Sequence, residues 1–217
     1  MAKTFTKYGK EISMVVKQGG PDPETNPRLR TIIQNAKTDN MPKDRIEAAI
    51  KRASAKDDKG YEEIIYEGYG PYAVAIVVET ATDNPTRTVA NIRMYFTRGG
   101  GALGKTGSLD FVFTRKGVFR FDAAGMDKDE LELELIDHGL DEIVEEEDEL
   151  VVYTPFAEFA RMQKFLEEKG LVVKSAELKR IPNTTVELNQ EQEDEIMDLI
   201  EKFEQDEDVQ AVYHNVS

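Results

Sequence analysis

The residues from Gly99 to Thr106 read GGGALGKT and match the phosphate-loop pattern G-x-x-x-x-G-K-T letter for letter. In nucleotide-binding proteins this loop leaves a strand and enters a helix at its Lys-Thr, so that backbone N–H groups and the helix dipole face the phosphates. Here the predicted order is reversed, because a helix precedes the loop and a strand, Leu109–Phe113, follows it. The negative end of that helix would face the loop. We therefore expect a flexible connection that touches a partner and not a nucleotide site.

The rest of the sequence offers no constellation of catalytic or metal-binding residues. It has no cysteine and two histidines, His138 and His214, which do not make a zinc site. No G-x-S-x-G motif marks a nucleophile. The acidic run Glu145–Glu149 lacks the spaced ligands and the turn glycine of a calcium loop, so we expect a solvated hairpin turn there. The sequence thus predicts no catalytic group, no metal and no cofactor.

Charge is distributed unevenly along the chain. The net charge of −15 taken alone argues against nucleic-acid binding, because affinity for phosphate comes from Lys and Arg. However, residues 1–59 hold thirteen Lys and Arg against eight Asp and Glu, a net of +5. Residues 60–217 hold fifteen against thirty-five, a net of −20. This asymmetry indicates an N-terminal end that faces nucleic acid.

The basic residues form two expected contact regions. On the first predicted helix, about Thr4 to Lys17, spacings of three, four and seven residues place lysines on one stripe opposite the apolar face; an ordinary solvated face is the alternative interpretation. The residues expected to contact phosphate are Lys3, Lys7, Lys10, Lys17, Arg28, Arg30, Lys43, Lys51 and Arg52. A second expected contact consists of the loop Gly99–Ser108 with Arg87, Arg98 and Lys105.

The elements that carry these residues fall into three groups. Three helices, at Thr4–Lys17, Arg28–Thr38 and from Met41 onwards, make a small helical domain. Alternating apolar residues and turn signals then predict a βαββαβ series, the ferredoxin-like order, within residues 116–181. Its elements are Val118–Phe121, Asp127–His138, Glu142–Val144, Leu150–Tyr153, Phe156–Lys169 and Leu171–Leu178.

The remaining elements flank this series on both sides, which predicts one ferredoxin-like domain inserted into another. They are Ala73–Val78, a helix from Pro85 to Gly99, Leu109–Phe113, Thr184–Leu188, Gln190–Gln205 and Val209–Tyr213. The expected fold class is α+β, with domains at residues 1–60, at 61–115 plus 182–217, and at 116–181. The segment Arg115–Phe121 faintly resembles the aromatic RNA-contact strand of an RRM, but core packing is the expected role of its phenylalanines.

Several stretches resemble the YebC/PmpR family, which includes mitochondrial translational activators of cytochrome oxidase. The matching segments are Met41–Ile50, Tyr66–Pro71, Thr82–Asn84 with Arg87–Val89, Gly99–Ser108, Ile181–Leu188 and Asp208–Asn215. The resemblance covers about residues 5–216 and implies a helical domain, two α/β domains and a non-enzymatic cytoplasmic factor. Many members begin with a longer basic stretch before Phe5, so we expect either a branch without that arm or a start at an internal methionine.

The resemblance implies two roles, and both remain open at this point. One is a DNA-binding regulator of transcription. The alternative is a ribosome-associated translation factor that binds rRNA or tRNA and relieves stalling at difficult sequences such as proline runs. A small-molecule sensor between the domains ranks last, because no convergent polar pocket is visible in the sequence. Without an apolar run of eighteen residues or a secretory signal, we expect a cytoplasmic protein with nucleic acid as its partner and neither a membrane nor a small-molecule substrate.

Overall fold

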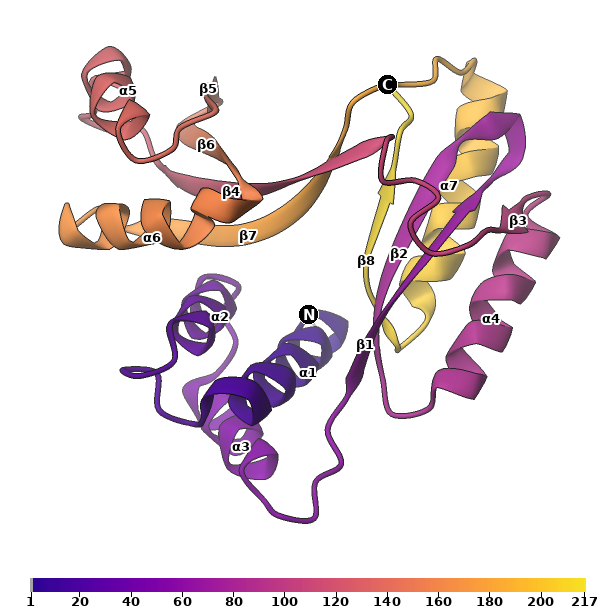
Figure 1. The fold of residues 1–217 in the computed structure, drawn as a ribbon, viewed down its shortest axis with the longest axis horizontal. Coiled ribbons are helices and arrows are strands. Elements are labelled where there is room, and N and C mark those ends of the chain that lie inside the picture. The colour runs from indigo at the N-terminus through magenta and orange to yellow at the C-terminus, as the bar shows by residue number, and fades with distance from the viewer. Residues whose placement is uncertain (1) are drawn as a thin grey trace.

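Three large hydrophobic cores and one smaller cluster organise the chain in the computed structural model, which describes residues 2–217. Figure 1 shows the helices and strands that carry them. The first core joins three helices: α1 (Ala2–Gly19), α2 (Pro27–Thr38) and α3 (Lys43–Ala53). Ile12, Leu29 and Ile46 lie at its centre. Asn26 caps α2 by accepting from the N–H of Leu29, and its amide also donates to the carbonyls of Val15 and Gly20. The three expected helices are confirmed.

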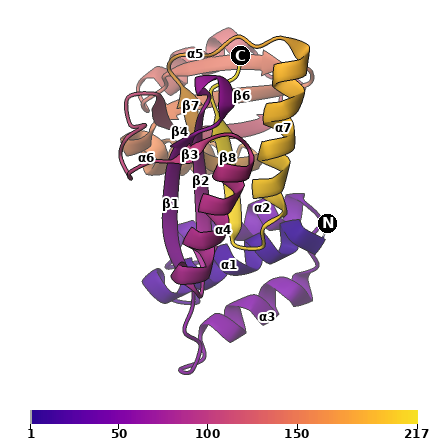
Figure 2. The ribbon, with the colours of Figure 1, turned by 90° about the vertical axis from the view of Figure 1, so that its right-hand side faces the viewer.

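The second core lies beneath an outer antiparallel sheet, whose strand order is β3-β1-β2-β8. The strands are β1 (Glu62–Tyr69), β2 (Ala75–Thr82), β3 (Ala102–Leu103) and β8 (Val209–His214), with a 3-10 turn, η1, at Pro71–Ala73. Helices α4 (Pro85–Arg98) and α7 (Gln190–Gln205) cover one face of this sheet (Figure 2). Phe96 and Phe203 meet edge to face between them, with ring centroids 4.8 Å apart.

Four details of this outer sheet differ from the sequence expectation. Strand β1 was not foreseen, and it forms a hairpin with β2. The short strand β3, within the expected loop, was not foreseen either, and it pairs with β1. Leu109–Phe113 is not a strand over most of its length but a series of turns. Its apolar side chains pack on the face of the sheet that α4 and α7 leave uncovered. The N–H of Leu109 donates to the carboxylate of Glu67 and is therefore not available to a neighbouring strand. Thr184–Leu188 is not a strand either and makes only an isolated bridge between Val186 and Val216.

The third core belongs to the inserted sheet, where the expected βαββαβ order is confirmed. The elements are β4 (Phe113–Asp122), α5 (Lys128–Ile136), β5 (Glu142–Glu146), β6 (Glu149–Pro155), η2 (Phe156–Glu158), α6 (Phe159–Glu168) and β7 (Val173–Pro182). The strand order β5-β6-β4-β7 is that of a ferredoxin-like sheet. Phe119 and Phe121 are fully buried, so core packing is indeed their role. The α+β fold class is confirmed, and we propose that the three cores mark the three domains expected from the sequence.

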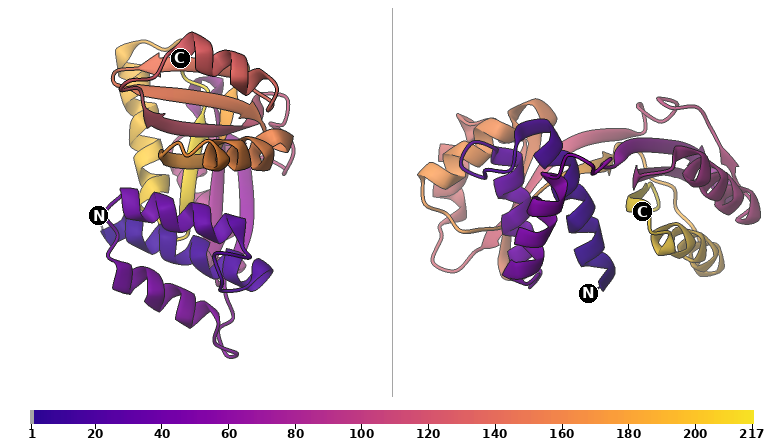
Figure 3. Two further views of the ribbon diagram at one scale, coloured as in Figure 1. Left: turned by 90° about the vertical axis from the view of Figure 1, so that its left-hand side faces the viewer. Right: turned by 90° about the horizontal axis from the view of Figure 1, so that it is seen from below.

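The helical unit is fastened to the open edge of the inserted sheet. Figure 3 shows α2 lying beside β7 and α6. The side-chain amide of Asn35 donates to the carbonyl of Ala176 at 2.9 Å and accepts from its N–H at 3.0 Å. These two bonds pair the N–H and the carbonyl of Ala176 on the edge strand β7. Unpaired backbone groups on an edge strand are otherwise free to pair with another chain. Arg30 adds an ion pair to Glu167 at 3.3 Å.

A glycine substitution tests the close packing of the outer unit. A Cβ added at Gly101 would lie 2.2 Å from the carbonyl oxygen of Tyr69, which is backbone and cannot move aside alone. We expect Gly101→Ala to lower the free energy of unfolding by about 1–3 kcal/mol. Gly9→Ala is the control, since its Cβ meets nothing within 4 Å inside α1, and it should raise stability by about 0.5–1 kcal/mol. Equal urea midpoints for the two variants would contradict this account.

Candidate nucleic-acid interface

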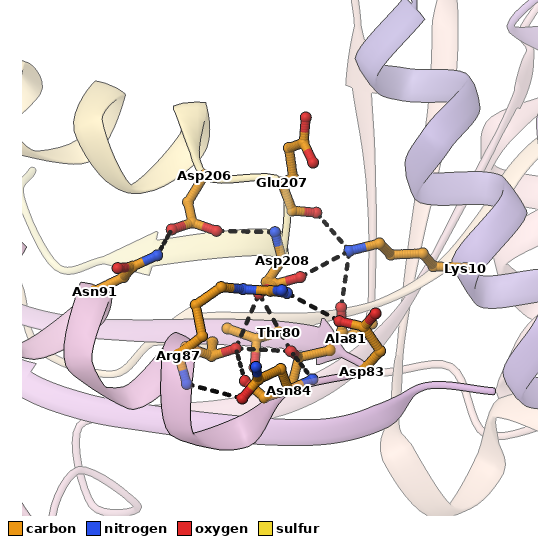
Figure 4. Close-up of polar contacts among 12 residues, drawn as sticks. Lys10, Thr80, Ala81, Asp83, Asn84, Arg87, Asn91, Asp206, Glu207 and Asp208 are labelled. Carbon is orange, nitrogen blue, oxygen red and sulfur yellow. Dashed lines mark hydrogen bonds and ion pairs between the residues drawn. The ribbon is translucent and has the colours of Figure 1, made fainter. Parts of the chain in front are cut away.

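A buried ion pair joins the first helix to the outer sheet. The ammonium of Lys10 lies 3.1 Å from the carboxylate of Asp208 and also donates to the carbonyls of Ala81, at 3.0 Å, and Glu207, at 2.7 Å. Figure 4 shows these bonds converging from α1, β2 and the turn before β8. Both side chains of the pair are less than one-tenth exposed. The ammonium of Lys10 is therefore saturated within the protein.

The second carboxylate oxygen of Asp208 accepts from the start of α4. Arg87 donates to it at 2.7 Å, Thr88 at 2.9 Å and Thr82 at 3.2 Å. Burial alone would raise the pKa of Asp208, but the hydrogen bonds from Arg87, Lys10 and Thr88 outweigh it and hold the pKa below its usual value. Arg87 also pairs with Asp83 at 2.9 Å. We call this group, centred on Asp208, the Asp208 cluster.

The lysine stripe of α1 is only partly buried, since Lys10 is buried and Lys7 half-buried while Lys3 and Lys17 are exposed. Besides Lys10, Lys17 pairs with Asp58 at 3.3 Å. Lys7 is half-buried, and its pKa is lowered by burial and by the neighbouring charge of Lys3. Lys3 itself is exposed. Of these four lysines, Lys10 contributes to docking of the helical unit, whereas Lys17 pairs within residues 1–59 and Lys3 and Lys7 make no ion pair with a described residue.

The two expected arginines of α2 also have partners within the chain. Arg28 is exposed and donates to the side chain of Gln18 at 2.9 Å. Arg30 donates to the carbonyl of Pro23 as well as pairing with Glu167. The ion pair with Glu167 holds Arg30 against α6 of the inserted unit, so we leave Arg30 out of the proposed contact surface.

Free positive charge lies on α3 and along a groove between α3 and α1. Arg45 and Arg52 line this groove, of about 340 Å³, opposite Phe5 and Gly9 of α1. Within residues 2–217, neither arginine makes an ion pair; the guanidinium of Arg45 stacks over the ring of Phe5 at 5.7 Å. Lys51 and Lys43 are also exposed on α3, and Lys43 pairs weakly with Glu47 at 3.6 Å. We call this surface the α3 basic groove.

Arg45 was missed by the sequence analysis. The available signal was its spacing of seven residues from Arg52, which puts the two side chains on one side of a helix. Of the expected set, the structure brings Lys10 and Arg52 together in this groove, although Lys10 is already occupied; Lys43 and Lys51 do not line it. Arg87, in contrast, lies at the opposite end of α4 from Arg98 and from the glycine-rich loop.

The glycine-rich loop is held by a carboxylate of the chain itself. The buried side chain of Glu67 accepts from the N–H of Gly107 at 2.9 Å and from that of Leu109 at 2.7 Å. The loop thus directs backbone donors to an anion, as a phosphate loop does, but the anion is internal. Arg98 and Lys105 are exposed near it. The expectation that this loop is not a nucleotide site remains our interpretation.

Across residues 2–217, no group of three or more His, Cys, Asp or Glu side chains is arranged to hold a metal ion. In the same range, no helix has the length and the apolar character needed to cross a membrane.

Comparison with known proteins places the whole chain in one family. Residues 1–56 match the model of the TACO1/YebC protein N-terminal domain, and residues 61–216 match that of the TACO1/YebC second and third domain. A probable transcriptional regulatory protein of Cytophaga hutchinsonii is 62% identical over all of this chain and 91% of its own length. One of Porphyromonas gingivalis is 56% identical over all of this chain and 90% of its own. The crystal structure of a conserved hypothetical protein from Aquifex aeolicus superimposes with a TM-score of 0.85 at 37% identity, covering 100% of this chain and 90% of that one.

Removing the charge of Asp208 tests the cluster. We expect Asp208→Asn to cost about 3 kcal/mol, because it leaves the ammonium of Lys10 buried without a counter-charge. Asp83→Asn removes an exposed partner of the same arginine and should cost less than about 0.5 kcal/mol. Since the folded pKa of Asp208 is lowered, the wild-type advantage should be full above the unfolded pKa of about 4 and vanish as the pH falls through the folded value. Urea unfolding of both variants between pH 2 and pH 7 measures this, and equal losses would refute it.

Proposed function

Because the chain belongs to the TACO1/YebC family, we propose that it is a non-enzymatic cytoplasmic regulator of gene expression that binds nucleic acid through the α3 basic groove. Relatives that cover its full length are named as probable transcriptional regulatory proteins, which supports a regulatory role. In this proposal a stretch of duplex DNA is the first candidate partner, as for a transcriptional regulator.

The observation that supports the groove most directly is its unpaired arginines. Arg45 and Arg52 lie side by side, and no carboxylate of residues 2–217 pairs with either of them. Arginine presents five N–H donors in a planar fork that suits phosphate oxygens. Gly9, without a side chain, leaves room on the α1 wall for a backbone to approach. Lys51, Lys43 and Lys3 would extend the contact along the phosphate chain.

Structured RNA is a second candidate partner, supported by the charge of the remaining chain. Residues 60–217 carry a net charge of −20, which a long duplex would repel wherever it passed the two sheets. A folded RNA site that meets only the groove would avoid this repulsion. Exposed Arg98 and Lys105 at the glycine-rich loop would then form a second, smaller contact.

Charge reversal in the groove tests the proposal. We expect the double variant Arg45→Glu, Arg52→Glu to weaken binding to a labelled nucleic acid about 10–100-fold and to reduce the salt slope of log K by about 2, since two phosphate contacts are lost. Fluorescence anisotropy against both a DNA duplex and an RNA hairpin, from 50 to 200 mM salt, gives both quantities. The tighter ligand at equal salt identifies the partner class.

The matched control carries the same change of charge elsewhere. Lys164 in α6 and Lys202 in α7 are exposed, and their replacement by Glu should weaken binding less than about twofold. An equal loss in both double variants would show that only net charge matters and would exclude the groove. Binding that does not respond to salt would exclude phosphate contacts altogether.

A further inference from the structure

A cavity of about 550 Å³ lies where the three units meet. Its walls come from α1 and α2, from β7 of the inserted sheet and from β8 of the outer sheet. Cavities of this size between domains are common ligand sites in proteins. Neither the groove between α1 and α3 nor the glycine-rich loop contributes to it.

Two polar side chains facing this cavity have no partner. The amide of Gln210 in β8 is completely buried, and neither its nitrogen nor its oxygen makes a hydrogen bond within residues 2–217. The carboxylate of Glu11 in α1 forms no ion pair or hydrogen bond with any described residue, and it also lines a smaller adjoining cavity together with Gln210. Buried polar groups in folded proteins are almost always hydrogen-bonded, so the unpaired amide of Gln210, beside a partly buried carboxylate that has no ion pair, indicates a missing partner.

Three of the other four carboxylates around the cavity already have partners. Glu79 pairs with Arg180 at 2.8 Å, and Glu177 pairs with Lys179 at 2.9 Å. Asp39 accepts from the hydroxyl of Tyr8 at 2.6 Å. The lining contains five carboxylates against three cations, with Lys7 the cation nearest in sequence to Glu11. Negative charge therefore remains available at Glu11 and at the exposed Glu204, neither of which pairs with a described residue.

The shape and the chemistry of the walls favour a positively charged organic ligand. The rings of Tyr8, Phe159 and Tyr213 line the cavity, and aromatic faces attract organic cations. Ile32 and Leu178 provide apolar wall that would contact a hydrocarbon body.

We propose that this cavity binds a small organic cation, an amine or a guanidinium compound with an apolar body, whose N–H groups donate to Glu11 and to the side-chain oxygen of Gln210. The sequence analysis had ranked a small-molecule sensor last because no convergent pocket was visible. The cavity is independent of the α3 basic groove, so the two proposals are tested separately.

The affinity of the cavity for a cation should depend on pH, because Glu11 titrates. Burial raises the pKa of Glu11 to about 7, and the carboxylates of Glu177 in β7, Glu79 in β2 and Glu63 in β1 act in the same direction, against the opposing charge of Lys7 in α1. A bound cation requires the ionised carboxylate. The affinity at pH 8 should therefore exceed that at pH 6 by about tenfold.

Isothermal titration calorimetry of the full chain, without nucleic acid, tests the proposal with two probes of nearly equal shape. We expect butylguanidine to bind saturably at one site at pH 8, and neutral butylurea to bind at least about tenfold more weakly. Glu11→Gln should weaken butylguanidine binding at least about tenfold. Glu47→Gln removes an exposed carboxylate of α3 and should leave it unchanged.

Three results would overturn the proposal: no saturable heat with butylguanidine, equal affinity for butylurea, or equal effects of Glu11→Gln and Glu47→Gln. Folding of the variant is checked by its melting temperature. Because the folded pKa of Glu11 is raised, its contribution to stability is lost as the pH rises through about 7. Glu11→Gln should therefore melt at or above the wild-type temperature at pH 8. Gln210→Leu provides a second variant, which should also lose butylguanidine binding.

Discussion

The buried contact between Lys10 and Asp208 fixes the arrangement of the molecule. It joins residues 198 positions apart, and each oxygen of the carboxylate and the ammonium itself are hydrogen-bonded. A buried ion pair adds little net stability, since both charges are desolvated, but a broken one is costly. The orientation of α1 against β2 and β8 is therefore set more sharply than apolar packing alone would set it. The edge bonds of Asn35 to Ala176 then fix the same helical unit against the inserted sheet.

This arrangement changes the meaning of the charge asymmetry. A basic head on an acidic body suggested lysines that face an external phosphate, yet Lys10 of α1 pairs with Asp208 of an acidic unit, and Lys17 pairs with Asp58 within residues 1–59. Opposite net charges on two units of one chain favour their docking as readily as the binding of a partner. The distinction rests on which cations remain unpaired after folding, and Arg45 and Arg52 of α3 are two of these.

Elements whose structure depends on nearby residues could be predicted from the sequence, whereas elements that depend on contacts with distant residues could not. The order of elements in the inserted unit was predicted because alternation and turn signals repeat along the chain, although β4 begins at Phe113, earlier than the expected Val118. Strand β1 was missed because Glu67, a buried carboxylate, interrupts its apolar pattern. The same residue explains the error at Leu109, whose apolar neighbours resemble a strand but whose N–H is bonded to a side chain 42 positions away. Likewise, the burial of Lys10 and the freedom of Arg45 depend on tertiary contacts that spacing does not reveal.

Strand β8 shows why the unpaired groups at the central cavity call for an explanation. Asp208 stands at its start and has a partner for both carboxylate oxygens. Two residues further on, the amide group of Gln210, whose nitrogen and oxygen are both buried, has none. Both positions lie at the contact between the outer sheet and α1, so poor packing of that contact would be expected to affect both. The carboxylate of Asp208 thus has all its hydrogen-bond partners. The amide of Gln210 has none, and it lies near a second unpaired side chain, Glu11. A binding partner outside the chain accounts for this difference, whereas a general looseness of the junction does not.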